Sequence, residues 1–359
     1  MDKGKRIFFY NAIPMPHSIL LHKKLVEAGF HVDFWYYKGL TKLYPWSSLD
    51  GNIQYNIYNK SWTDCRKIFQ QSRQSNLMVI TGWHTLVHLF LIVYAFVSRK
   101  KMALWLDVHE VKISRFTFFR NKCLIKMASY LFVTGSNGID MIHHDMGINK
   151  RRMKNFPYLT AEFDADEMKE INSLRSRQLA EGCQIKLLIS NRFIVRKGYA
   201  IIIEALSKMP AALLQKFDIT VLGIGPDFEM YREQFEKIRT TIFLRGWIEY
   251  EGYLQEMKQT DVFLHASLAE PYGIPPMDAI CCGKLVIGSS GVISCRDKIV
   301  SGTNGFLYPK DDAQQLCSIL SNVAENPQQI YEIGGSALIT AASLGYQHNI
   351  NVVKEVLAF

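Results

Sequence analysis

Two carboxylates stand eight positions apart in the segment EPYGIPPMDAICCGK, between the apolar runs DVFLHAS and LVIGSS: Glu270 and Asp278. Pro275 and Pro276 favour the first turn of a helix and Gly283 favours its end, so the segment is predicted to be strand, loop, short helix, strand. This places the loop that carries Glu270 at the carboxyl end of a strand. In open α/β sheets, ligands bind at the edge formed by the carboxyl ends of the strands. Such carboxylates could form the acid/base pair of a hydrolase, or they could accept hydrogen bonds from sugar hydroxyls.

A second group of residues has the chemistry of an anion site. In NRFIVRKGYAIIIEAL, three cations stand between a predicted strand and a predicted helix, Arg192, Arg196 and Lys197, and Gly198 permits close approach. Cations beside the free N–H groups of a helix N-terminus bind diphosphates, although an ordinary basic loop has the same composition. A hydrolase does not need a diphosphate-binding site, so these cations favour the interpretation in which the carboxylates bind sugar hydroxyls.

The turn VLGIGPDF contains Gly223 and Gly225 after a predicted strand. A dinucleotide fingerprint needs a third Gly where Phe228 stands, and no acidic residue follows at the expected distance after a suitable strand. We therefore reject NAD and interpret the pair as a tight strand-to-helix turn.

Short apolar runs alternate with helical patterns through both halves of the chain, which predicts doubly wound parallel sheets. Residues 161–181 are strongly charged without a strand pattern and are expected to cross between domains. We predict a first domain at 1–165, a second domain at 182–340 and a helix at 341–359 that packs back towards the first domain. Two such halves would leave a ligand cleft between them.

Composition is that of a folded protein, with 48% hydrophobic and 21% charged residues over 359 positions. Seven cysteines without paired spacing are expected to be reduced thiols in a cytoplasmic protein. The net charge of +9 arises in residues 1–160, which hold 23 Lys and Arg against 9 Asp and Glu. This half either meets an acidic ligand or membrane surface, or uses its lysines for solubility.

The longest apolar run, LVHLFLIVYAFV at 86–97, falls short of the roughly 18–20 residues that cross a bilayer. Two interpretations remain open for it. One is a buried helix of the first domain. The other is an interfacial helix that places Arg99, Lys100 and Lys101 near acidic lipid head groups.

Together these segments resemble the retaining glycosyltransferases of family 4, which have the GT-B fold of two facing Rossmann-like domains with a central cleft. The family signature E-x-F-G-L-P-P-L-E-A-M-A-C-G-x-P-V-I stands here as EPYGIPPMDAICCGKLVI, with Asp278 in place of the second Glu. Its motifs G-R-L-x-x-x-K-G, G-x-G-P and N-G-F-L are matched by NRFIVRKG, GIGP and NGFLYPKDD. The resemblance is strong over residues 185–320 and weak before residue 160.

The resemblance implies that Glu270 holds hydroxyls of the donor sugar and that Asp278 holds the ribose of the nucleotide. Arg192 and Lys197 would neutralise the leaving diphosphate. We expect further contacts to the nucleotide sugar from Tyr272, from N–H groups around Gly273 and Ile274, and from the turn at Gly223 and Gly225. No metal or other cofactor is implied, because the cations do what a divalent ion does elsewhere.

In the first domain, WLDVHE places His109 at a strand end, where the family often carries a His facing the donor sugar; a purely structural His is the alternative. Trp83 and His84 could line the acceptor side. His84 and His88 have the i, i+4 spacing of a metal pair, but no Glu follows His84 and no third ligand is evident, so no metal is predicted.

We therefore predict a retaining hexosyltransferase that moves a sugar from a UDP- or GDP-linked donor to a glycan or polyprenyl-diphosphate-linked acceptor, in polysaccharide or lipopolysaccharide assembly. We expect a cytoplasmic protein, with peripheral contact to the anionic inner face of the plasma membrane as a further hypothesis, and no nucleic-acid partner. Two alternatives stay open: a degenerate sugar-nucleotide-binding subunit, which the unusual first loop NAIPMPHS favours, and a nucleotide-sugar epimerase of the same fold.

Overall fold

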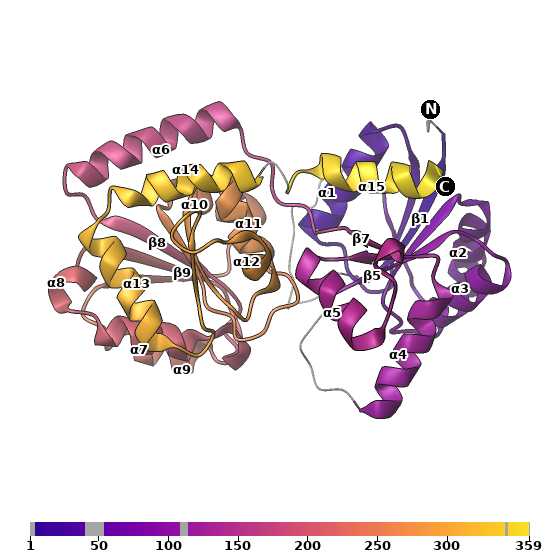
Figure 1. Cartoon of the computed structure of the whole chain (residues 1–359), viewed down its shortest axis with the longest axis horizontal. Helices are drawn as coiled ribbons and strands as arrows, with labels where there is room; N and C mark the ends of the chain where they lie inside the picture. The colour runs from indigo at the N-terminus through magenta and orange to yellow at the C-terminus, as the bar shows by residue number, and fades with distance from the viewer. Residues whose placement is uncertain (1–3, 40–53, 108–113, 342–343, 359) are drawn as a thin grey trace. The chain divides into compact units, whose positions relative to one another are not determined.

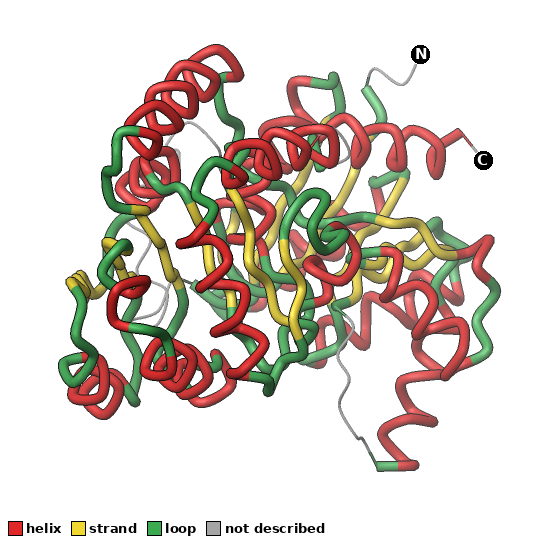
Figure 2. Tube along the Cα trace, turned by 60° about the vertical axis from the view of Figure 1, so that its left-hand side comes forward, coloured by secondary structure: helices red, strands yellow, loops and turns green. Residues whose placement is uncertain are grey.

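The computed structural model of the chain describes residues 4–39, 54–107, 114–341 and 344–358. The chain divides into two compact units (Figure 1): unit 1 is Met1–Leu159 together with Tyr346–Phe359, and unit 2 is Thr160–Gly345. In each unit the strands lie inside and the helices outside (Figure 2). Among the described residues, no helix combines the length and the apolar character needed to cross a membrane.

Unit 1 contains a parallel sheet of seven strands in the order β3-β2-β1-β4-β5-β6-β7. Alternate residues of β1 enter opposite cores, because successive side chains of a strand point to opposite faces: Ile7 and Phe9 join one core, and Phe8 and Tyr10 join the other. The strands are β1 (Arg6–Asn11), β2 (His31–Tyr36), β3 (Asn56–Ile57), β4 (Leu77–Thr81), β5 (Met102–Leu106), β6 (Tyr130–Val133) and β7 (Met153–Asn155).

Helices cover both faces of this sheet, as a parallel sheet with apolar strands requires. On one face α1 packs with the C-terminal helix α15, where Leu25 and Val353 are fully buried in the same core. On the other face lie α2, α3, α4 and α5. The helices of unit 1 are α1 (Pro16–Glu27), α2 (Trp62–Gln74), α3 (Leu86–Val97), α4 (Arg115–Met127), α5 (Ser136–Met146), the 3-10 turn η1 (Lys150–Arg152) and α15 (Tyr346–Ala358).

Unit 2 contains a parallel sheet of six strands in the order β10-β9-β8-β11-β12-β13, with helices on both sides. Its strands are β8 (Ile185–Ser190), β9 (Phe217–Leu222), β10 (Thr241–Gly246), β11 (Val262–His265), β12 (Leu285–Ser289) and β13 (Phe306–Tyr308). Its helices are α6 (Ala165–Ala180), the 3-10 turn η2 (Val195–Lys197), α7 (Tyr199–Lys208), α8 (Ala211–Leu214), α9 (Phe228–Phe235), α10 (Tyr250–Gln259), α11 (Ile274–Cys281), α12 (Ile293–Lys298), α13 (Ala313–Glu325) and α14 (Gln329–Ala341).

The loop and short helix predicted after DVFLHAS are observed. The segment after β11 forms a loop and then α11, with prolines inside its first turn. Side chains of Ser61, Thr85 and Ser114 each accept a backbone N–H at the start of α2, α3 and α4, which is the usual N-cap chemistry. The charged segment 161–181 was expected to cross between domains, but it lies within unit 2, where most of it forms the long helix α6.

Candidate functional site

Glu270 lies in the loop between β11 and α11, and partners hold both of its carboxylate oxygens. Its Oε1 accepts a hydrogen bond from Lys197 Nζ at 2.7 Å, and its Oε2 lies 2.7 Å from His265 Nε2. Lys197 ends the turn η2 after β8, and His265 is the last residue of β11. Since β8 and β11 are adjacent parallel strands, their carboxyl ends bring the three side chains to one edge of the sheet.

The electrostatics of this cluster favour an ionised Glu270. Burial by itself would raise the pKa of Glu270, but attraction to His265 and Lys197 and the hydrogen bonds to them outweigh burial and hold that pKa well below its usual range. Burial lowers the pKa of Lys197, an effect that Glu270 opposes and that the charges of Arg196 and Arg192 reinforce. The cluster is thus a fixed carboxylate among cations, suited to accept hydrogen bonds from hydroxyl groups.

The turn that carries Lys197 is locked to the loop that carries Glu270. Arg196 accepts a hydrogen bond at its carbonyl from Leu268 N at 2.9 Å and donates one from Nη1 to Ala269 O at 3.0 Å. Gly198 has φ +74°, and a Cβ there would lie 2.0 Å from the carbonyl oxygen of Ala266. Only glycine fits both the left-handed backbone and this close approach, so Gly198 sets the position of Lys197.

Gly223 and Gly225 allow the turn after β9 to approach the loop after β8 closely. A Cβ at Gly223 would lie 1.8 Å from Asn191 O, and one at Gly225 would lie 2.2 Å from Phe193 O. Arg192, between those two residues, is half-buried and close enough to Lys197 to depress its pKa. Gly223 and Gly225 therefore position the strand-end loop that carries Arg192.

The start of α11 lies beside the carboxylate. Gly273 is the N-cap residue, with φ +91°, and a Cβ there would lie 3.8 Å from Glu270 Cδ. Ile274 is the first helical residue, so free backbone N–H groups of the helix start next to Glu270. Tyr272 is 2% exposed, and its carbonyl accepts a hydrogen bond from Ser294 N at 2.9 Å. Tyr272 thus anchors the helix start from the interior.

Asp278 belongs to a different hydrogen-bonded group. It is 1% exposed; its Oδ1 accepts from Ala161 N at 2.8 Å and its Oδ2 accepts from Tyr253 OH at 2.9 Å. Burial raises the pKa of Asp278 to about 7, although both hydrogen bonds oppose the shift. In this arrangement the carboxyl group ties α11 to α10 and to the first residues of unit 2.

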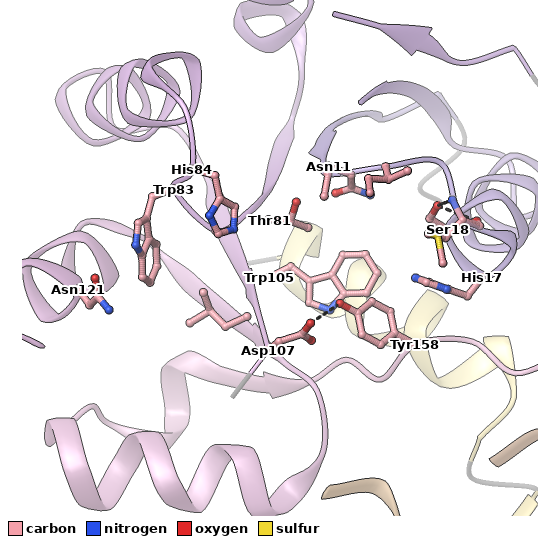
Figure 3. Close-up of a pocket in the computed structure, with 15 residues that line it drawn as sticks. Asn11, His17, Ser18, Thr81, Trp83, His84, Trp105, Asp107, Asn121 and Tyr158 are labelled. Atoms are coloured by element: carbon pink, nitrogen blue, oxygen red, sulfur yellow. Dashed lines mark hydrogen bonds between the residues drawn. The ribbon is translucent and has the colours of Figure 1, made fainter. Parts of the chain in front are cut away.

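Unit 1 has a pocket of about 600 Å³ at the carboxyl ends of β1, β4 and β5 (Figure 3). The rings of Trp105 and Tyr158 lie side by side in it, with centroids 5.1 Å apart, and Tyr158 OH donates to Asp107 Oδ2 at 2.9 Å. Trp83 and His84, which were expected on the acceptor side, also line it. His109 lies outside the described residues.

Two polar atoms at this pocket are buried and have no hydrogen-bond partner among the described residues: the donor Trp105 Nε1 and the acceptor Asn11 Oδ1. Buried polar groups are normally paired, so these two atoms are available to a polar ligand or to ordered water. Aromatic rings beside unpaired donors and acceptors suit a polyol such as a sugar, whose C–H faces pack on rings and whose hydroxyls both donate and accept.

No cluster of three or more His, Cys, Asp or Glu side chains suited to a metal ion occurs in the described part of the chain. His88, the second half of the His84–His88 pair, is fully buried, and its Nδ1 lies 2.8 Å from Thr85 Oγ1. His88 therefore contributes to the core at the start of α3.

Several residues of these sites were missed in the sequence. His265 stood at the end of the run DVFLHAS, and its position at a strand end directly before the Glu270 loop was the available signal. Asn11, Trp105, Asp107 and Tyr158 come from strand ends and a loop that only the fold of unit 1 brings together.

Comparison with known proteins finds a family model that matches most of the second half of the chain. Residues 171–334 match the family model of glycosyl transferases group 1. The chain is 23% identical over 176 residues to an uncharacterized glycosyltransferase of Methanocaldococcus jannaschii, covering 48% of this chain and 44% of that protein. It is 28% identical over 134 residues to the phosphatidyl-myo-inositol mannosyltransferase of Mycolicibacterium smegmatis, and this match covers 37% of this chain and 34% of that protein. The chain thus spans less than half the length of these curated relatives.

Solved structures extend the likeness to the whole chain. The Anabaena protein Alr3699/HepE, solved in complex with UDP and glucose, has a TM-score of 0.74 at 17% identity and covers 99% of this chain and 100% of its own. The sucrose-phosphate synthase of Thermosynechococcus elongatus has a TM-score of 0.71 at 14% identity, with 98% of each chain covered. The chain therefore has the GT-B fold of two parallel-sheet, Rossmann-like units, and its residues 171–334 match the family model of glycosyl transferases group 1.

Proposed function

We propose that this protein is a retaining glycosyltransferase that moves a sugar from a nucleotide-diphosphate sugar to a lipid-linked or glycan acceptor. The observation that carries the proposal is the Glu270 carboxylate held between Lys197 and His265, within the residues that match the group 1 family model. Each carboxylate oxygen has two lone pairs, so Glu270 can accept hydrogen bonds from sugar hydroxyls while it keeps both protein partners.

The charge of the leaving group is balanced by protein cations in this proposal. Lys197, Arg192 and the free N–H groups at Gly273 and Ile274 surround the position next to Glu270, where a diphosphate would gain negative charge as the sugar leaves. The bond from the anomeric carbon to the diphosphate oxygen breaks, and a bond from that carbon to the acceptor oxygen forms on the same face. The acceptor proton passes to the departing diphosphate. Asp278 is 1% exposed, so it would reach the ribose only if the residues that cover it moved.

The pocket of unit 1 is the proposed acceptor site. Its support is the pair of unpaired polar atoms, on Trp105 and Asn11, beside aromatic rings. A lipid-linked acceptor suits the relative named phosphatidyl-myo-inositol mannosyltransferase, and a lipopolysaccharide acceptor suits a structural neighbour named lipopolysaccharide outer core galactosyltransferase. Neighbours solved with UDP make UDP-linked sugars the first donors to try, ahead of GDP-linked ones.

The test is nucleotide release from a panel of UDP- and GDP-sugars, with and without an extract of lipid-linked acceptors, followed by NMR of the anomeric configuration in the product. We expect release that requires one donor and the extract, that survives EDTA, and that Glu270→Gln lowers by about a hundredfold or more. Turnover without an acceptor would indicate an epimerase instead. Nucleotide binding without any turnover would indicate a degenerate subunit. An inverted product would overturn the retaining mechanism.

A further inference from the structure

The outward face of α3 is apolar throughout. The sequence of α3, LVHLFLIVYAFV, contains no Asp, Glu, Lys or Arg, and its inward residues are buried in the core of unit 1. At 100° per residue, six exposed side chains fall within one arc of about 120°. Leu86 and Val97, near the two ends of the helix, are 84% and 74% exposed. The six, which we call the α3 face, are Leu86, Leu89, Phe90, Val93, Phe96 and Val97.

The inward side of α3 agrees with the interpretation of residues 86–97 as a buried helix of the first domain, and the interfacial interpretation concerns the outward side. The inward side is a core element, with Leu91 and Ile92 fully buried. The outward side is an apolar surface that no described part of the chain covers. A contiguous apolar surface of this kind marks an interaction site more often than an accident of sequence.

Cations border the α3 face on the side of α2. The Phe69 ring on α2 contacts the rings of Phe90 and Tyr94, with centroids 5.7 Å and 5.0 Å apart. Arg66 and Arg73 stand three positions before and four positions after Phe69, so they lie on the same side of α2 as that ring. Both arginines are exposed. Trp62, one turn before Arg66, is 84% exposed on the same stripe.

Cations also border the opposite side, on α4. Helices α3 and α4 are in contact and lie with α2 on one face of the unit 1 sheet (Figure 1). The exposed side of α4 combines two aromatic rings with three cations: Phe116, Phe119, Arg115, Arg120 and Lys126. No Asp or Glu occurs in residues 65–106 or 111–139. The apolar surface is thus framed by positive charge alone.

We propose that the α3 face, with its basic borders on α2 and α4, docks on a bilayer surface rich in anionic phospholipid. The apolar side chains enter the boundary between head groups and acyl chains, and the arginines and lysine contact lipid phosphates. A second copy of the chain fits less well, because pairing two α3 faces brings their basic borders together without any carboxylate to compensate.

Docking would also place the pocket of unit 1 near the lipid. Trp83 and His84 line that pocket, and Leu86, the first residue of the α3 face, follows His84 by two positions. A lipid-linked acceptor could then enter the pocket without leaving the membrane surface. Docking itself does not depend on sugar transfer, and it can be measured without donor or acceptor.

The test is co-sedimentation of the full chain with vesicles of phosphatidylcholine alone and of phosphatidylcholine mixed equally with phosphatidylglycerol, at low and high salt. The variant Leu86→Glu with Val97→Glu removes the two most exposed apolar side chains of the face. Its control is Leu174→Glu with Ile339→Glu, which adds the same charge at exposed apolar positions of unit 2, where Ile339 is 82% exposed. Arg66→Gln with Arg73→Gln removes cations, and Arg177→Gln with Lys208→Gln is the matched control.

We expect the wild type to bind the mixed vesicles, and more weakly at high salt. Each α3-face or arginine variant should lower binding by about tenfold or more, while both controls stay within about twofold of wild type. Unchanged thermal unfolding would show that the exposed substitutions leave the fold intact. Absence of wild-type binding, or equal losses in variants and controls, would overturn the proposal. So would a dimer that the Leu86→Glu, Val97→Glu variant dissociates, because the face would then be an interface between copies.

Discussion

Lys197 Nζ lies 2.7 Å from Glu270 Oε1, although the two residues are 73 positions apart, and both side chains are largely buried. A buried ion pair has lost its hydration, so removing one partner leaves an uncompensated charge in the interior. The second oxygen of Glu270 is held by His265, so the carboxylate keeps one partner when Lys197 is lost.

Replacement of Lys197 by Met should therefore lower the free energy of unfolding by about 3 kcal/mol. Glu270→Gln combined with Lys197→Met should cost clearly less than the sum of the two single substitutions, because the double variant buries no unpaired charge. Urea unfolding of the four proteins in this cycle measures the coupling. Strict additivity would contradict a direct interaction between the two side chains.

Asp278 should make the protein less stable as the pH rises. A carboxyl group in an unfolded chain loses its proton near about pH 4, whereas the raised pKa of Asp278 is about 7. Between these values the unfolded state binds fewer protons than the folded state, so the free energy of unfolding falls by up to about 1.4 kcal/mol per pH unit. Above the folded pKa the loss is complete.

Asp278→Asn should abolish this dependence of the unfolding free energy on pH, because an amide does not titrate. The amide keeps an oxygen for Ala161 N and offers an N–H group to the Tyr253 hydroxyl. We expect the variant to gain stability relative to wild type between about pH 5 and about pH 8, measured by urea unfolding. Glu204→Gln, at an exposed carboxylate on α7, is the control and should follow the wild-type profile. Parallel profiles for Asp278→Asn and wild type would contradict the raised pKa.

Gly198→Ala should lower the free energy of unfolding far more than the same substitution at another glycine with positive φ. Gly302 has φ +79° with no atom within 4 Å of a Cβ, so its substitution by Ala should cost only backbone strain, about 1 kcal/mol. At Gly198 a Cβ would also meet the Ala266 carbonyl, which raises the expected cost to about 3 kcal/mol.

Because Gly198 positions Lys197, Gly198→Ala should also lower sugar transfer, whereas Gly302→Ala should not. Equilibrium unfolding and nucleotide release on the same two variants give both readouts. Equal stability losses would show that the Ala266 carbonyl can move aside.

Trp105→Phe should separate ligand binding from stability. The Trp105 Nε1 donor has no partner within the described residues, whereas Trp35 Nε1 donates to Gln71 Oε1 at 2.6 Å. Both substitutions remove a similar volume from a buried site, but only Trp35→Phe breaks an existing hydrogen bond, so it should destabilise the fold more.

Only Trp105→Phe should raise the KM for the acceptor, by about three- to tenfold, because one hydrogen bond to a sugar hydroxyl is lost. The KM for the donor should not change. An unchanged acceptor KM would argue against the unit 1 pocket as the acceptor site.

The sequence predicted those features that depend on neighbours along the chain. The pattern DVFLHAS, EPYGIPP, LVIGSS was sufficient for β11, the loop, α11 and β12, because proline, glycine and apolar runs act locally. The charged segment before residue 181 contains no strand, as predicted, but the sequence did not predict that it forms α6 within unit 2. Lys197 was identified through its motif, but its contact with Glu270 depends on the pairing of β8 with β11, which periodicity does not encode.

The environment of Asp278 could not be predicted for a similar reason. Its partners are Tyr253, on α10, and the backbone of Ala161, more than a hundred positions away in sequence. The sequence placed a carboxylate in the correct helix, but whether it faces solvent or the interior depends on how α10 and the start of unit 2 pack around α11. The α3 face could not be predicted for another reason. Every side of that helix is apolar, so the sequence has no periodic pattern that shows which side is buried.

The helix α15 has a consequence for the order in which the protein can be made. Unit 1 is built from two segments, Met1–Leu159 and Tyr346–Phe359, with the whole of unit 2 inserted between them. Its core needs Ile350, Val353 and Val356 from α15 beside α1. During synthesis, every residue of unit 2 leaves the ribosome before α15 does. Unit 2 can therefore complete its core first, while the nascent unit 1 waits with one side of its sheet incompletely covered and in need of protection from aggregation.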